Sequence, residues 1–326
     1  MTGLLDRVDA PPAPTSTDTS TPAERLRGTM AACRVRFTWF GVQKSLTAPQ
    51  KALAAGAFDA EAPCLSAAKR LVDTRHAAFR AVTAVRSKIT EAWRSVSLPF
   101  PEPGVRLIKQ ECVAAFAADM ADYKAELDDA VAGLGRHYGE LKRSAESRLG
   151  SLFDPADYPA TLDGLFDVAV DFPGVEPPGY LVALCPGLYE REQARVTARF
   201  EEAVRLAEDA FLDEFARAVT HLCERVTGVN DDGTPKVFRD SAVGNLLDFF
   251  DRFRSLNVRS DARLDELVDR ARRAVRGVDA GGLRDSGALR DHVAEQLGRV
   301  GESLDAMLVA RPRRRILRQA STPGGD

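Results

Sequence analysis

The four histidines and five cysteines are the side chains best suited to bind a metal ion or to act as nucleophiles. No histidine has a second histidine or a cysteine three or four residues away. His221 and Cys223 are two residues apart and point to different faces of a helix. The sequence also lacks the P-loop pattern and the GxSxG nucleophile motif. It therefore predicts no catalytic, cofactor-binding or metal-binding residues, and hence a protein that is not an enzyme.

Carboxylates are numerous near residues 119–129 and 201–214, where their spacing places them on the solvent-facing side of helices. We interpret them as solvated surface. An alternative is an enzyme whose site is assembled by the fold from scattered helical carboxylates and histidines. That alternative predicts a cleft with convergent polar groups.

The densest cluster of charge lies at the end of the chain and consists of Arg311, Arg313, Arg314, Arg315 and Arg318. Such a cluster can neutralise a few phosphates or contact an acidic partner, but it contains no aromatic side chain for stacking on bases. We interpret it as a solvated basic tail. The alternative is nucleic-acid binding, which predicts an affinity that falls steeply with salt and is lost when the chain is cut at Ala310.

The composition of the 326-residue chain is that of a folded protein, with 44% hydrophobic residues and a net charge of only -3. No global field attracts it to nucleic acid or to an anionic membrane. No run of 18 apolar residues exists that could span a bilayer. The cysteines are odd in number, widely spaced and without a CxxC pair, which favours reduced thiols and a cytoplasmic location.

Long runs of apolar residues recur at gaps of three or four, a spacing that places them on one face of a helix. They predict long helices over about 64–94, 105–149 and 189–227, and shorter helices over 240–308. The two longest helices are expected to pair antiparallel. The segment between them is long enough to turn the chain round.

A small β element is predicted near 33–42 and 167–184. Residues 33–42 alternate between apolar and polar, and 167–171 and 180–184 are β-prone and bracketed by prolines. The predicted fold class is mainly α: an elongated antiparallel helical bundle or coiled-coil stalk with a small β element. The predicted organisation is a disordered leader over 1–30, one elongated helical domain over 31–310 and a basic disordered tail over 311–326.

A candidate interaction surface follows the predicted turn at residues 228–236 and consists of Phe238, Arg239, Asp240 and Asn245. The start of a helix offers backbone donors, and an arginine beside them could receive an acidic group of a partner. The alternative interpretation is that Phe238 is a hydrophobic staple and Asp240 merely caps the helix.

Several stretches resemble an uncharacterised bacterial and phage family known as domain of unknown function 3150, over roughly residues 34–278. The stretches are Trp39 with Lys44-Ser45-Leu46, Ser97-Leu98-Pro99-Phe100-Pro101 with Gly104-Val105-Arg106, Leu152-Phe153-Asp154-Pro155-Ala156-Asp157-Tyr158-Pro159, and Val237-Phe238-Arg239-Asp240-Ser241-Ala242-Val243 with Asn245. Members of that family tend to be encoded near MoxR-type AAA+ ATPases and von Willebrand A-type proteins. The resemblance implies no catalytic residues; it implies a helical accessory protein in an ATPase-driven assembly.

The expected function is therefore a non-enzymatic helical scaffold or adaptor that mediates protein–protein interaction, accessory to a MoxR-type AAA+ ATPase or a phage-related assembly. Its expected partners are such an ATPase, a von Willebrand A-type protein or a second copy of the chain, without cofactor or membrane. Uncovered apolar surface along long helices is the feature expected to bind them.

Overall fold

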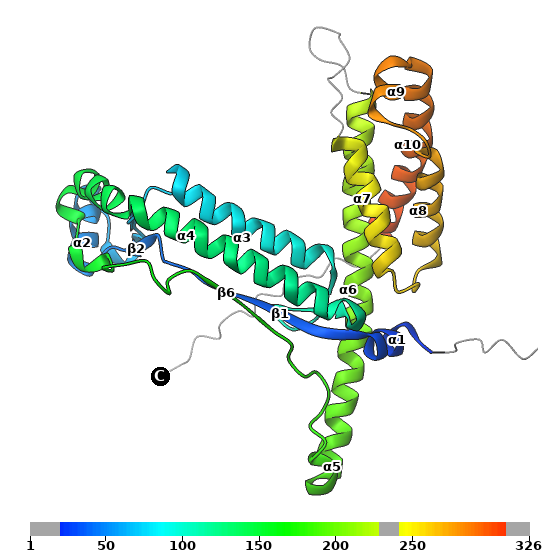
Figure 1. Ribbon diagram of the computed structural model, residues 1–326, viewed down its shortest axis with the longest axis horizontal. Helices are drawn as coiled ribbons and strands as arrows, with labels where there is room; N and C mark the ends of the chain where they lie inside the picture. Colours follow the sequence, from blue (N-terminus) through cyan, green and yellow to red (C-terminus); the bar gives the residue numbers. More distant parts are fainter. Residues whose placement is uncertain (1–19, 228–240, 311–326) are drawn as a thin grey trace, which may run out of the picture.

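The protein has two arms that meet at an angle, as seen in a computed structural model that describes residues 20–227 and 241–310 (Figure 1). In the sheet arm (residues 30–171), a hairpin of α3 (Ala77–Ser95) and α4 (Val113–Leu149) lies along a small sheet. The bundle arm (residues 186–227 and 241–310) is built on the long helix α6 (Pro186–Thr227). The predicted mainly α class with a small β element is confirmed.

The sheet has four antiparallel strands in the order β4 (Ser97–Pro99), β5 (Val105–Lys109), β1 (Met30–Thr38) and β6 (Asp167–Asp171). The central strand β1 pairs with β5 through its first half and with β6 through its second half. Of the predicted β stretches, 167–171 forms a strand over its whole length, and 33–42 forms one up to Thr38, while residues 39–42 lie outside it.

The two faces of β1 contribute to different hydrophobic cores. Met30 and Ala32 pack in the core that contains α6, whereas Cys33 and Val35 pack in the core that contains α3 and α4. Successive side chains of a strand point to opposite faces, so neighbouring residues can be buried on opposite sides. The sheet is therefore the wall that the two cores share.

The far end of the sheet arm carries a second, two-stranded sheet of β2 (Gln43–Ser45) and β3 (Ala68–Arg70), beside α2 (Ala48–Gly56). Thr47 accepts a hydrogen bond from the backbone of Gln50 and the Gln50 side chain accepts one from the backbone of Thr47. This capping box fixes the start of α2.

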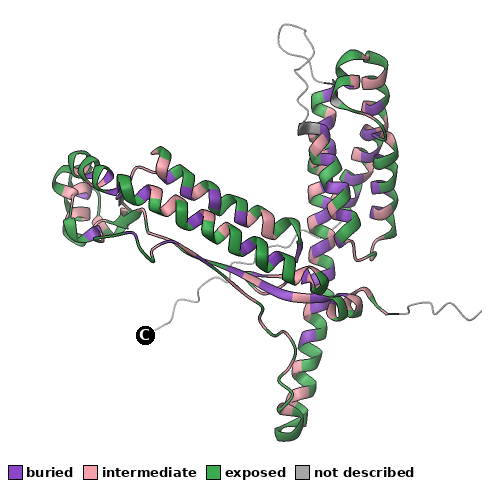
Figure 2. Ribbon diagram, in the orientation of Figure 1, coloured by how far each residue is buried: buried purple, intermediate pink, exposed green. Residues whose placement is uncertain are grey.

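In the bundle arm, α7 (Ser241–Leu256) and α10 (Gly287–Ala310) pack on α6, while α8 (Ala262–Ala274) and the short α9 (Ala280–Asp285) pack on α10. Buried residues, coloured purple in Figure 2, recur along these helices and belong to one hydrophobic core. Phenylalanines dominate the contact between α6 and α7; the rings of Phe215 and Phe249 stack with centroids 4.9 Å apart.

Two short helices lie beside the lower half of α6. Helix α1 (Pro22–Thr29) packs on it, and α5 (Leu181–Leu184) immediately precedes it. Residues 22–29 were predicted to belong to a disordered leader, and that part of the prediction is wrong. Thr21 and Glu24 form a capping box, Pro22 opens the helix and Leu26 is buried.

The long helix predicted over 105–149 begins only at Val113. Residues 105–109 form β5, and 110–112 form a 3₁₀ turn. Leu107 and Ile108 are both fully buried, on opposite faces of the sheet. The apolar spacing of this segment was also compatible with a helix, but pairing with β1 favours the strand.

The helix predicted over 64–94 is likewise shorter, since α3 begins at Ala77. Residues 68–70 pair with β2 instead. Two predicted features of the next region are also wrong: residues 181–184 form the helical turn α5 and not a strand, and the two longest helices do not pair. Helix α4 packs against α3, its neighbour across the β4–β5 hairpin, and α6 packs against α7 and α10. The described helices thus form a hairpin on the sheet in one arm and a bundle in the other, and no coiled-coil stalk.

Candidate functional site

The residues singled out in the sequence fall largely outside the described part of the chain. Phe238, Arg239 and Asp240 lie outside the described residues. So do the tail residues Arg311, Arg313, Arg314, Arg315 and Arg318. Asn245 is described; it is exposed on α7 and lines a cleft between the two arms. Through Asn245, this cleft contains one of the residues predicted from the sequence.

The cleft has a volume of about 1150 Å³, and its walls come from both arms. Helix α3 forms one wall, α6 and α7 form the other, and Arg106 of β5 lies between them. Because α3 and α6 belong to different cores, the shape of the cleft depends on the angle at which the arms meet. Its volume is comparable with that of small-molecule sites.

Arginine is the main charged residue of the cleft. Five arginines line it, from α3, β5, α6 and α7: Arg86, Arg94, Arg106, Arg217 and Arg252. The carboxylates among the lining residues are Glu91, Glu214 and Asp248, so the arginines outnumber them. The other polar lining residues are Thr83, Ser87, Thr90, Ser95, His221 and Asn245.

Two of these arginines are held in place by the protein. Arg252 forms an ion pair with Glu214 and donates through Nε to the backbone oxygen of Ser95, at 3.2 Å, which links α7 to the end of α3. Arg106 donates through Nε to Ser97 Oγ at 2.7 Å and through Nη2 to the Ser97 carbonyl oxygen at 2.8 Å. The Nη1 group of Arg106 has no hydrogen-bond partner among the described residues.

The crowding of positive charge affects Arg106 itself. Burial, reinforced by the nearby charges of Arg252 and Arg94, lowers the pKa of Arg106 to about 10. The charge of Glu214 acts to raise the pKa of Arg106, but Glu214 is already paired with Arg252. The guanidinium groups at this point therefore repel one another in a partly desolvated place, and an anion bound among them would relieve that repulsion.

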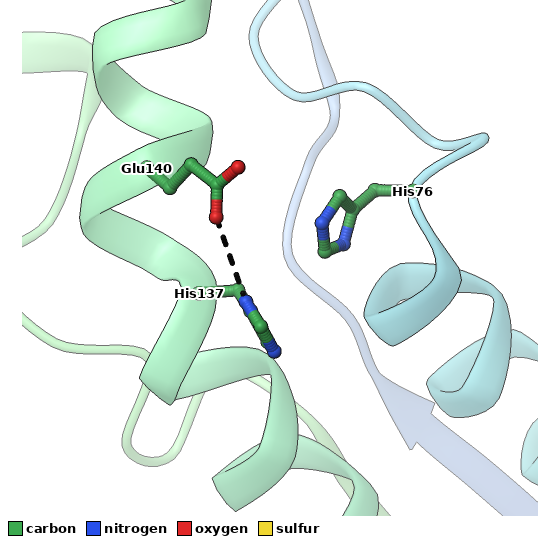
Figure 3. Close-up of side chains that lie close together, drawn as sticks. All are labelled: His76, His137 and Glu140. Carbon is green, nitrogen blue, oxygen red and sulfur yellow. Dashed lines mark ion pairs between the residues drawn. The ribbon is translucent and has the colours of Figure 1, made fainter.

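A second cluster lies on the sheet arm, where His76, His137 and Glu140 come together (Figure 3). Their ligand atoms lie within 4.8 Å of one another, and the two imidazole centroids are 5.2 Å apart. His137 and Glu140 are on α4, and His76 precedes the first turn of α3. The cluster could not be recognised from the spacing of its residues, because packing of α3 against α4 brings the histidines together.

Helix capping by His76 argues against metal binding at this cluster. His76 Nδ1 accepts a hydrogen bond from the backbone N–H of Ala78 at 3.2 Å, so the proton of the neutral ring is on Nε2. A metal at Nε2 needs the lone pair of that nitrogen, and the proton would then have to move to Nδ1 and break the cap. Glu140 and His137 are exposed. We interpret the cluster as a helix cap beside a surface pair.

A buried ion cluster holds the far end of the sheet arm together. The side chain of Asp157 is fully buried; it pairs with Lys44 and, at 2.6 Å, with the buried Lys69. Lys69 also donates to the backbone oxygen of Leu152 at 2.7 Å. Hydrogen bonds from Lys44 and Lys69 lower the pKa of Asp157 below its ordinary value. No catalytic role is required to explain this cluster, because each lysine joins a different strand to the loop after α4.

Five residues of the stretches that carried the family resemblance lie at the cleft or at the buried ion cluster. Ser97, Arg106 and Asn245 belong to the arginine-lined cleft or its support, and Lys44 and Asp157 belong to the buried ion cluster. No protein-family model, curated protein or solved structure matches the chain.

Sequence reasoning missed the cleft because its arginines are far apart in the chain. A weak signal exists in the spacing of Arg86, Thr90 and Arg94, which places them on one face of α3. Arg217 and His221 have the same spacing on α6. Such pairs are common on solvated helices, so the spacing alone does not identify a site.

Proposed function

We propose that the protein is a non-enzymatic scaffold or adaptor in the cytoplasm, accessory to a MoxR-type AAA+ ATPase or a phage-related assembly. The observation that carries the proposal is the exposed apolar surface of the short helix α5 and of the residue that precedes it. There, Tyr180, Val182 and Leu184 are 64%, 52% and 77% exposed, respectively.

This part of the chain stands clear of the rest of the molecule. Helix α5 and the first turns of α6 project beyond the sheet and are coloured as exposed in Figure 2. Large apolar side chains gathered on a projecting end are a common feature of surfaces that bind another protein. We call residues 180–184 the apolar tip.

The far end of the sheet arm offers a second such place. Leu53 and Phe58 are 78% and 79% exposed at and just beyond α2. Exposed apolar groups at two separate places on the molecule suit a bridging role, in which each place binds a different partner. The choice of an ATPase or a von Willebrand A-type protein as partner rests on the family resemblance.

The experiment uses the full-length chain and two purified partners from the same source, a MoxR-type ATPase and a von Willebrand A-type protein. Binding is measured by size-exclusion chromatography with light scattering. We expect the wild type to form a complex with at least one of them and the V182S/L184S variant to lose it. Both residues are exposed, so the fold should survive.

The matched control is Val309→Ser, which makes the same kind of change at the 86% exposed side chain near the end of α10. This variant should bind as the wild type does. Two results would contradict the proposal: a wild-type chain that binds neither partner, or a tip variant that binds with unchanged affinity.

A further inference from the structure

We propose that the cleft between the arms binds an oligophosphate, a chain of linked phosphate groups, through Arg94 and Arg106 on the sheet arm and Arg217 on the bundle arm. The site is separate from the apolar tip, so this inference goes beyond the scaffold function and does not depend on it.

Positive charge converges in the cleft. Arg94, Arg106 and Arg252 lie close enough for their charges to act on one another, and only Arg252 has a carboxylate partner among the described residues. A single carboxylate of a peptide carries one charge, whereas a phosphate group in a chain presents several oxygens and neighbouring charges at one place. Converging guanidinium groups therefore suit a chain of phosphate groups better than a single carboxylate.

The type of cation in the cleft also favours phosphate. Among the described residues that line the cleft, arginine is the permanently charged cation, and no lysine is among them. The planar guanidinium presents N–H groups in a fork that fits two oxygens of one phosphate. The unused Nη1 group of Arg106 is available for such a contact, since Ser97 occupies Nε and Nη2.

The arginines are spread along and across the cleft. Arg86 and Arg94 are eight residues apart on α3, or about 12 Å along a helix. Arg217 lies on the opposite wall. A single phosphate cannot contact such a spread of cations, but a chain of phosphates can. Glu91 and Asp248 also line the cleft and limit how far along its walls an anion is stabilised.

Oligophosphate could come from a nucleoside triphosphate or from an inorganic chain, and the test separates the two. Isothermal titration calorimetry measures the binding of tripolyphosphate, ATP, AMP and an oligoglutamate peptide to the full-length protein. The fluorescence of the tryptophans gives a local signal. The guanidinium of Arg106 is 5.9 Å from the ring centroid of Trp93, and that of Arg86 is 4.8 Å from Trp39.

The test variant is R94Q/R217Q, which removes two exposed arginines from opposite walls. Its matched control is R80Q/R225Q, which removes exposed arginines from the same two helices outside the cleft. We expect the test variant to bind tripolyphosphate about 100-fold more weakly, roughly tenfold for each charge-assisted contact, and the control to change little. Circular dichroism checks that both variants fold.

Equal affinity for tripolyphosphate and ATP supports an inorganic chain as ligand, and much tighter ATP binding supports a nucleotide. AMP should bind far more weakly than either. The proposal is overturned if neither tripolyphosphate nor ATP binds, if the test and control variants behave alike, or if oligoglutamate binds more tightly than the phosphates.

Discussion

The sheet arm and the bundle arm are held together by different interactions, although both are largely helical. The bundle arm buries an apolar core in which phenylalanines of α6 and α7 stack and pack edge to face. The sheet arm has an apolar core too, but a buried carboxylate with two lysines holds its far end and further ion pairs cross its helices and strands.

Because the interactions differ, different changes should lower the stability of each arm. Apolar burial is affected most by a change in side-chain volume, whereas a buried ion cluster is affected by charge and pH. The two tryptophans of the chain, Trp39 and Trp93, both belong to the sheet arm. Tryptophan fluorescence therefore reports on one arm, and circular dichroism reports on the helices of both.

The largest effect is expected in the bundle arm from Phe215→Ala. Phe215 is fully buried and stacks on Phe249, so truncation leaves a cavity between α6 and α7. We expect the free energy of unfolding of this arm to fall by about 3–5 kcal/mol, as measured by urea denaturation followed by circular dichroism. Leu247→Ala, at a 44% exposed position of α7, is the control and should cost little. A similar loss in both variants would contradict the view that the phenylalanine stack holds this arm.

The next largest effect is expected in the sheet arm from Asp157→Asn, which leaves the buried Lys69 without its charge partner. Breaking a buried pair in this way costs about 3 kcal/mol. Tryptophan fluorescence should follow the loss during urea denaturation. The control is Asp163→Asn, a neutralised carboxylate at an exposed position of the same segment. An unchanged urea midpoint in the D157N variant would show that the ion cluster does not stabilise the arm.

Acid should separate the arms. The carboxyls of Asp157 and Asp167 in the sheet arm have lowered pKa values because of hydrogen bonds from lysines. The stability that these two carboxylates add to the folded state is fully present above the ordinary carboxyl pKa of 3.8. It is lost as the pH falls through their lower pKa values in the folded protein. In a titration from pH 5 to about 2, tryptophan fluorescence should therefore change before all the helical signal is lost. Coincident transitions would indicate that the arms unfold as one unit.

The smallest effect is expected at the helix caps, one in each arm. Asp261 accepts hydrogen bonds from two backbone N–H groups at the start of α8, and His76 accepts one at the start of α3. We expect Asp261→Ala to cost about 1 kcal/mol and His76→Ala less, since it loses one hydrogen bond and not two. Amide hydrogen exchange in the first turn of each helix measures the difference. A greater loss of protection in H76A would reverse this ranking.

The comparison also shows which parts of the fold the sequence could predict. Helix α6 was located almost to its ends because its apolar stripe is unbroken. Strand β1 was recognised by its alternation. Residues 105–112 were assigned to a helix because Ile108 and Cys112 continue the stripe of α4, and nothing local in the sequence reveals that β1 lies beside them.

The candidate site was far less predictable than the helices. Arg94, Arg106 and Arg217 converge only because the arms meet at a particular angle, and that angle depends on contacts made by both faces of the sheet. Of the residues chosen from the sequence, Asn245 lies at the cleft. The other candidates, at 238–240 and in the tail, lie outside the described residues.

The alternation of β1 between two cores has a consequence for how this gene can vary. A one-codon insertion or deletion in most strands moves the side chains of one core into solvent. In β1 the same change would exchange Ala32 and Cys33 between the two cores. Side chains that now pack against α6 would then face α3 and α4, and those that now pack against α3 and α4 would face α6. The nine-residue strand should therefore keep its length even where the loops around it lengthen or shorten among related genes.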